Sequence, residues 1–153
     1  MNFKNKLILS AVLFVILLLI SCSSNKTSQN ILSSHVSPNN CRINGTVVSI
    51  EEIREETGPC STEPCLAKVK INNVIETGSS FSKPLIKGDT IKIKFEFTLA
   101  ETNKDLFPAL NFVLPGLSSG DSFIGDVEFL KVIQLNSSTS PLEYRIFNYN
   151  KID

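Results

Sequence analysis

The sequence has no tryptophan, one methionine and one histidine, so several kinds of functional site lack their usual parts. The methionine is the first residue, which leaves soft copper sites without a methionine ligand. The histidine, His35, lies in a polar stretch ahead of the expected folded part, so Ser-His-Asp and Cys-His catalysis have no rigidly held base. A glycine-rich phosphate-binding loop is also missing. We therefore expect no catalytic residues and no cofactor.

One long apolar run is present, close to the N-terminus. Lys4 and Lys6 precede the 14 residues from Leu7 to Ile20, which only Ser10 interrupts. Positive charge followed by such a run is typical of a secretion signal peptide. A helix needs about 20 apolar residues to span a bilayer, so an uncleaved transmembrane anchor is the weaker interpretation. We expect residues 1–21 to be a signal peptide that is removed.

The apolar run ends in the motif Leu19-Ile20-Ser21-Cys22. An aliphatic residue three positions before a cysteine, with a small residue directly before it, resembles the lipobox of bacterial lipoproteins. The resemblance implies that the Cys22 thiol carries diacylglyceryl, that the chain is cut before Cys22, and that the new amine is acylated, for example with palmitate. The expected location is the cell envelope, on the periplasmic side or at the outer membrane. An ordinary signal peptide that leaves Cys22 as a thiol is the alternative.

Residues 22–40 are rich in serine and asparagine and show neither helical nor strand periodicity. They are expected to form a flexible tether between the lipid and one domain, residues 41–153. The full chain has 15 basic and 15 acidic side chains. Removal of the signal peptide takes away Lys4 and Lys6 and no acidic residue, so the mature chain has a formal charge of −2. This balance does not favour nucleic acid as a partner.

The domain is dominated by strand-like alternation of apolar and polar residues. The pair Asn72-Asn73 interrupts the second apolar pattern and predicts a bulge or bend. Helix is scarce: 50–56 is a candidate for one turn and 102–110 for a short helix, against Pro108. The strands are expected at 45–50, 65–76, 90–99, 123–129 with a continuation toward 135, and 144–149.

Glycine and proline residues mark the turns between these strands. Lys87-Gly88-Asp89 and Ser119-Gly120-Asp121 introduce the third and fourth strands, and 114–117 contains a Pro-Gly turn. The pattern predicts an all-β, mainly antiparallel domain that forms a small Greek-key barrel or sandwich. Its long connection between the third and fourth strands resembles that of an OB-fold.

Cys41, Cys60 and Cys65 remain once Cys22 carries lipid. Disulfides persist outside the cytoplasm, and the turn-rich spacing favours a Cys60–Cys65 bridge. The alternatives join Cys41 to Cys60 or Cys65, or leave Cys41 free or in an intermolecular bond. A zinc site would need His35 as its fourth ligand, so no metal is expected.

A non-enzymatic binding or assembly role is the expected function, with the membrane contacted through Cys22. A possible binding patch is formed by Lys68, Lys70, Lys92 and Lys94, which point to the solvent side of neighbouring strands. The patch suits an envelope protein or an anionic glycan or lipid. Nucleic acid is disfavoured again, because Phe95 and Phe97 alternate to the opposite side from the lysines.

Two other functions are weighed against binding. The first is an envelope-polymer hydrolase that uses surface carboxylates. The second is an inhibitor-like role for the OB-type scaffold, which lipidation of Cys22 argues against because it blocks a free N-terminal cysteine amine. The carboxylate pairs considered for the hydrolase are Glu51/Glu52, Glu55/Glu56 and Asp121/Asp126.

Overall fold

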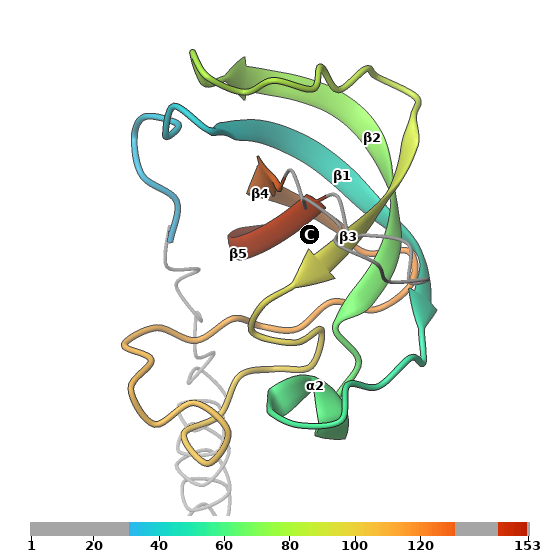
Figure 1. Cartoon of the computed structure of the whole chain (residues 1–153), viewed down its shortest axis with the longest axis vertical. Helices are drawn as coiled ribbons and strands as arrows, with labels where there is room; N and C mark the ends of the chain where they lie inside the picture. The colour runs from blue at the N-terminus through green and yellow to red at the C-terminus, as the bar shows by residue number, and fades with distance from the viewer. Residues whose placement is uncertain (1–30, 131–143, 153) are drawn as a thin grey trace, which may run out of the picture.

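A computed structural model describes residues 31–130 and 144–152 of the chain. Within these residues the fold is one sheet of five strands with a single short helix, as predicted for an all-β domain (Figure 1). No helix in the described part is long and apolar enough to cross a membrane. The elements are β1 (Asn40–Glu51), α2 (Pro59–Thr62), β2 (Leu66–Thr77), β3 (Thr90–Phe95), β4 (Ser122–Phe129) and β5 (Tyr144–Ile152).

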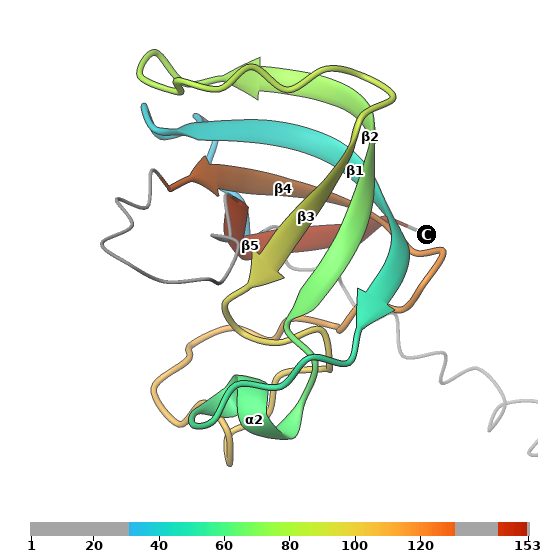
Figure 2. The ribbon, with the colours of Figure 1, turned by 45° about the vertical axis from the view of Figure 1, so that its right-hand side comes forward.

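The sheet closes into a ring in the order β1-β2-β3-β5-β4, with β4 paired back to β1 (Figure 2). All neighbours are antiparallel except β3 and β5, which run parallel from the pair Ile93 and Tyr144 to the pair Phe95 and Ile146. The long connection follows β3, as the OB-like Greek key predicts. β5 pairs with both β3 and β4, so the expected terminal strand covers two edges.

Alternate residues of the strands point their side chains into the ring, and these side chains form the core. Phe95, Phe123 and Tyr149 lie at its centre in edge-to-face contact, with ring centroids 5.7–6.0 Å apart. Such contacts add roughly 0.5–1.5 kcal/mol per pair to the burial of the rings. Three different strands are thus joined through one aromatic cluster.

The predicted bend in the second strand is confirmed. Between the pairs Asn44–Asn73 and Gly45–Ile71 the register shifts, and Asn72 is the extra residue of β2. Two further shifts leave Ile75 on β2 and Val48 on β1 without a direct partner. Each bulge increases local twist, so β1 and β2 curve strongly around the core (Figure 2).

Strand boundaries differ from the prediction by three or more residues at three places, one of which is the end of β5 at Ile152 rather than at residue 149. β1 starts at Asn40 rather than at Gly45, because Cys41 and Ile43 also bury their side chains. β3 ends at Phe95 rather than at Leu99. Thr98 adopts φ 67°, a left-handed conformation that ends any strand.

Neither candidate helix forms. Residues 50 and 51 belong to β1, and 102–110 form turns without a helix. The short helix α2 lies instead at Pro59–Thr62, where Pro59 occupies its first turn. Proline is suited to that position because its fixed φ is helical and its missing N–H would be unpaired there anyway.

The connection from β3 to β4, residues 96–121, covers one end of the ring. Leu99, Leu114 and Leu117 from this segment join the core. Phe97 is only partly buried, next to the core, and makes edge-to-face contacts with Phe107, Phe112 and Phe147. Phe97 therefore packs against the connection and β5 rather than continuing the alternation of β3.

The two Gly-Asp segments form turns, as predicted. Gly88 and Gly120 have φ of 97° and 94°, which favour glycine. In the second turn the Asp121 carboxylate accepts a hydrogen bond from Ser118 N at 2.7 Å, which is the local bonding expected of aspartate in a turn.

Residues 31–39, the second half of the predicted tether, lie against the domain. Ile31 N donates to Asn150 Oδ1 at 3.1 Å, and Ser80 N donates to Pro38 O at 2.8 Å. Ile31 is partly buried against the core. The signal peptide, Cys22 and the first half of the tether lie outside the described residues, as does the predicted continuation of β4 beyond Leu130.

Gly125→Ala is expected to lower the free energy of unfolding by about 1–3 kcal/mol, the usual cost of overpacking. A Cβ at this position of β4 would lie 2.3 Å from Ile146 Cδ1. Ile146→Val removes that methyl group, so the double variant should be more stable than the sum of the single effects predicts. Denaturant unfolding followed by circular dichroism measures all three variants, and strict additivity would contradict the contact.

Candidate binding surfaces

The four lysines of the predicted patch lie on β2 and β3. Lys68 is directly opposite Lys92 in the antiparallel register, Lys70 is opposite Thr90, and Lys94 is opposite Leu66. Like charges directly opposite each other destabilise a sheet. The fold therefore brings the lysines together on the outer face at some cost. This set of four is called the lysine stripe below.

Acidic residues from the end of β1 and from the β1–β2 connection neutralise half of the lysine stripe. Lys92 Nζ lies 2.8 Å from Glu51 Oε2, and Lys94 pairs with Glu55. Lys68 and Lys70 are exposed and have no ion pair among the described residues. The uncompensated positive charge of the stripe is thus on β2.

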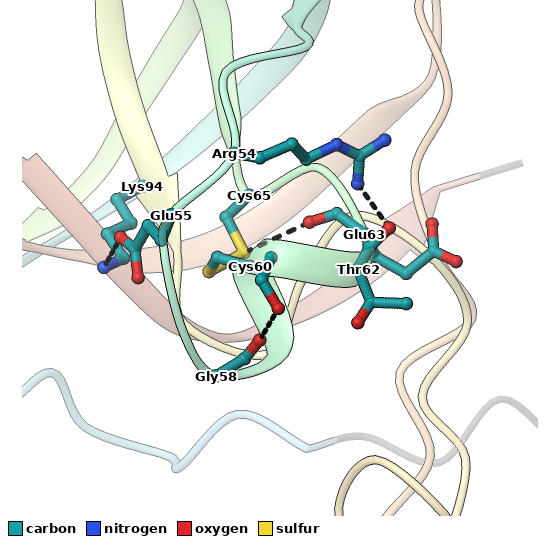
Figure 3. The surroundings of a disulfide bond; sticks show 9 residues. Arg54, Glu55, Gly58, Cys60, Thr62, Glu63, Cys65 and Lys94 are labelled. Atoms are coloured by element: carbon teal, nitrogen blue, oxygen red, sulfur yellow. Dashed lines mark hydrogen bonds and ion pairs between the residues drawn. A yellow bond between two sulfur atoms is a disulfide. The ribbon is translucent and has the colours of Figure 1, made fainter.

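The disulfide Cys60–Cys65 is present, and the preferred pairing is confirmed. Both cysteines are buried, and Phe95 N donates to Cys65 O at 2.7 Å. Arg54 extends across the same loop and donates to Thr62 O at 2.6 Å (Figure 3). The bridge therefore fastens the loop that carries Glu55 next to the end of β3.

Cys41 is free and completely buried, so both alternatives that bond it to Cys60 or Cys65 are wrong. Its thiol lies 3.7 Å from Thr77 Oγ1 on the neighbouring strand. Burial raises the pKa of the Cys41 thiol. An inaccessible, protonated thiol does not form an intermolecular disulfide in the folded state.

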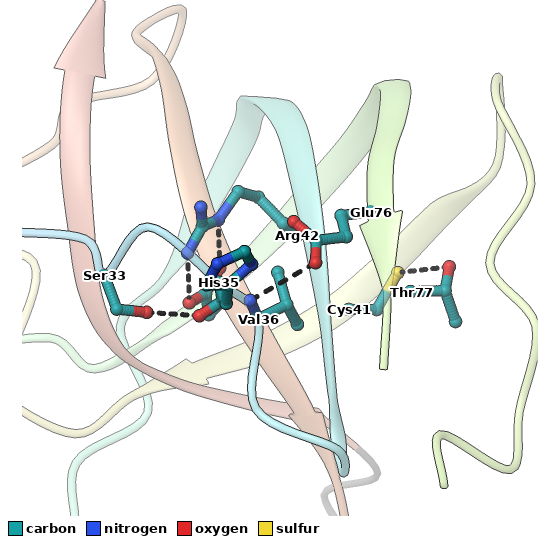
Figure 4. A network of polar contacts seen from close by, with 8 residues as sticks. Ser33, His35, Val36, Cys41, Arg42, Glu76 and Thr77 are labelled. Atoms are coloured by element: carbon teal, nitrogen blue, oxygen red, sulfur yellow. Dashed lines mark hydrogen bonds and ion pairs between the residues drawn. The ribbon is translucent and has the colours of Figure 1, made fainter. Parts of the chain in front are cut away.

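Arg42 and Asp126 join β1 to β4 through two hydrogen bonds, Nε to Oδ1 at 2.6 Å and Nη2 to Oδ2 at 2.8 Å. The carboxylate raises the pKa of Arg42 still further. Residues 33–36 cross next to this pair, and Val36 N approaches Glu76 Oε1 at 3.4 Å (Figure 4). His35 in this segment is exposed, as a linker histidine is expected to be.

Five of the six carboxylates considered for hydrolysis form ion pairs, and Glu56 is the one without an ion pair among the described residues. Glu52 Oε2 lies 3.0 Å from Arg54 Nη2. Glu51, Glu55 and Asp126 pair with Lys92, Lys94 and Arg42 as described above, and Asp121 Oδ2 lies 2.6 Å from Lys151 Nζ. The hydrogen bond from Lys151 lowers the pKa of Asp121, whereas a general acid needs a raised pKa. Across residues 31–130 and 144–152 no group of three or more His, Cys, Asp or Glu is placed to hold a metal ion.

A polar depression on the outer face was missed by the sequence reasoning. Its volume is about 510 Å³. The available signal was the presence of asparagine inside two strands, where this residue is disfavoured. The depression is lined by Asn44, Asn72, Gly120, Asp121, Ser122, Lys151 and Ile152.

Asp121→Asn is expected to make the melting temperature fall less steeply as the pH is lowered into the acid range. Lys151 and the Ser118 amide lower the pKa of Asp121 by hydrogen bonding. The resulting stabilisation is present above the ordinary aspartate pKa of about 3.9 and is lost as the pH falls through the lower pKa of the folded state. Calorimetric melting temperatures against pH measure this difference.

The matched control is Asp89→Asn in the other Gly-Asp turn, where the carboxylate has no hydrogen bond or ion pair within the described residues. This variant should keep the acid profile of the wild type. Identical acid profiles for Asp121→Asn and the wild type would contradict the role of the Asp121 contacts.

Comparison of the chain with models of known protein families, with curated proteins and with solved structures finds no match. A function for this protein is therefore inferred from its own residues and their arrangement.

Proposed function

We propose that this chain is a lipid-anchored lipoprotein of the bacterial cell envelope with a non-enzymatic binding role. The motif Leu19-Ile20-Ser21-Cys22 supports lipidation at Cys22. Each buried methylene contributes about 0.8 kcal/mol, so two or three acyl chains hold a protein stably at a bilayer without a spanning helix.

The short distance between the anchor and the domain is the observation that carries the binding role. Ile31 already contacts Asn150 on β5, so only the eight residues 23–30 lie between the lipidated Cys22 and Ile31. The nine Cα–Cα steps from Cys22 to Ile31 extend to about 30 Å at most. The lipid headgroups of the same membrane are therefore the nearest extended surface.

The lysine stripe supports anionic headgroups as the bound partner. Lys68 faces Lys92 across the strand pair, and the exposed Lys70 follows on the same side of β2. A lysine near an anionic bilayer contributes about 1 kcal/mol, and this attraction declines within about 10 Å at ordinary ionic strength. The anchor would supply the proximity that so weak an attraction needs.

Cys22→Ala is expected to release the domain from the membrane fraction or to leave an unprocessed precursor, because no thiol remains for the lipid. Fractionation followed by intact-mass measurement distinguishes the two results. Ser23→Ala is the matched control and should be processed and retained like the wild type. Full membrane retention of a correctly cut Cys22→Ala chain would refute the anchor.

Lys68 and Lys70 are expected to react more slowly with an amine-labelling reagent in nanodiscs that contain phosphatidylglycerol than in zwitterionic nanodiscs. The mature lipidated protein is used, and peptide mass spectrometry measures each lysine. Lys104, in the β3–β4 connection, is the internal control. Equal labelling of Lys68 in both discs would contradict headgroup binding, and protection only after addition of a soluble polyanionic glycan would assign the stripe to glycan instead.

A further inference from the structure

The polar depression lies on the outer face where β1, β2, β4 and β5 contribute side chains. Asn44 comes from β1, Asn72 from β2, Ser122 from the start of β4, and Lys151 and Ile152 from the end of β5. Its volume of about 510 Å³ is within the range of roughly 300–1,000 Å³ for small-molecule sites. It does not include the lysine stripe.

A chain of hydrogen bonds fixes the polar side chains at its centre. Asn72 Nδ2 donates to Asn44 Oδ1 at 3.1 Å and to Thr46 Oγ1 at 2.8 Å. The Thr46 and Ser122 hydroxyls lie 2.9 Å apart. Among the described residues, the Asn44 amide nitrogen and the Asn72 carbonyl oxygen have no partner. One amide donor and one amide acceptor are thus held side by side and available to a ligand.

The backbone has an irregularity at the same place. Asn72 is the extra residue of a β-bulge, and it points to the outer face opposite Asn44 and Thr46. Bulges are enriched next to functional sites, where they direct a side chain. Asparagine at both positions also goes against strand propensity. Sheet curvature accounts for the bulge, but it does not account for asparagine at both of these positions.

The edge of the depression carries one acidic and one basic side chain, Asp121 and Lys151, so its net charge is zero. Asp121 Oδ2 accepts hydrogen bonds from Ser118 N and Lys151 Nζ, and its other oxygen is left for a ligand. Ile152 is the one aliphatic side chain of the lining. Balanced charge, alternating donors and acceptors and one apolar contact suit a neutral ligand rich in hydroxyl groups rather than an ion.

We propose that this depression binds a neutral saccharide that carries an N-acetyl group. The acetamido carbonyl accepts from the Asn44 amide, and the acetamido N–H donates to the Asn72 carbonyl oxygen. The methyl group contacts Ile152, and ring hydroxyls bind the Ser122 hydroxyl and the Asp121 carboxylate. The site is independent of lipidation at Cys22 and of the lysine stripe.

Titration calorimetry of the mature full chain with the disaccharide of N-acetylglucosamine tests the proposal, in a detergent without a sugar headgroup. Cellobiose has the same sugar framework without the N-acetyl groups. Binding of the N-acetylated disaccharide, about tenfold or more tighter than that of cellobiose, is the expected result. Absence of binding, or equal binding of the two sugars, would overturn the proposal, as would displacement by inorganic phosphate.

Asn44→Asp is the decisive variant because it keeps the oxygen that Asn72 requires and removes the amide donor. It should weaken binding by about tenfold or more. Asn73→Asp is the matched control: it adds the same charge to the exposed neighbour of Asn72, outside the lining, and should bind like the wild type. Ser122→Ala is a second lining variant, and it should also weaken binding. It serves as the test if Asn44→Asp does not fold. Unchanged affinity in a folded lining variant would overturn the proposal.

Discussion

Closure of the sheet is the constraint on which the rest of the structure depends. β1 must pair along one edge with β2 and along the other with β4, and a flat strand cannot do both around so small a core. The bulges at Asn72 and Val48 supply the curvature. Gly125 allows β4 to approach Ile146 of β5 closely, which a larger residue would prevent. Local backbone irregularities therefore make the global ring possible.

Because the apolar side of every strand faces inward, specificity can reside only on the outer face and in the connections. There several ion pairs link separate parts of the chain, such as Lys92 to the end of β1 and Arg42 to β4. The Cys60–Cys65 loop takes part as well, through Glu55 and Lys94. The lysine stripe and the polar depression remain as two chemically different surfaces, one cationic and one neutral.

Alternation of apolar residues was sufficient to predict the all-β class, the five strands and the bend at Asn72-Asn73. It failed at Thr98, where the chain turns although the apolar pattern continues to Leu99, because backbone conformation is set there by packing of the long connection. The disulfide followed from loop chemistry. The polar depression could not be predicted, since Asn44, Asp121 and Lys151 are distant in sequence and meet only through strand register.

The position of β5 has a consequence for how the domain is made. This strand is the last to be synthesised among the described elements, yet it lies between β3 and β4 and pairs with both. Until it arrives, β3 and β4 each present an open row of backbone donors and acceptors, which invites association between nascent chains. A chaperone that shields such edges during biogenesis would protect this polypeptide at its most vulnerable stage.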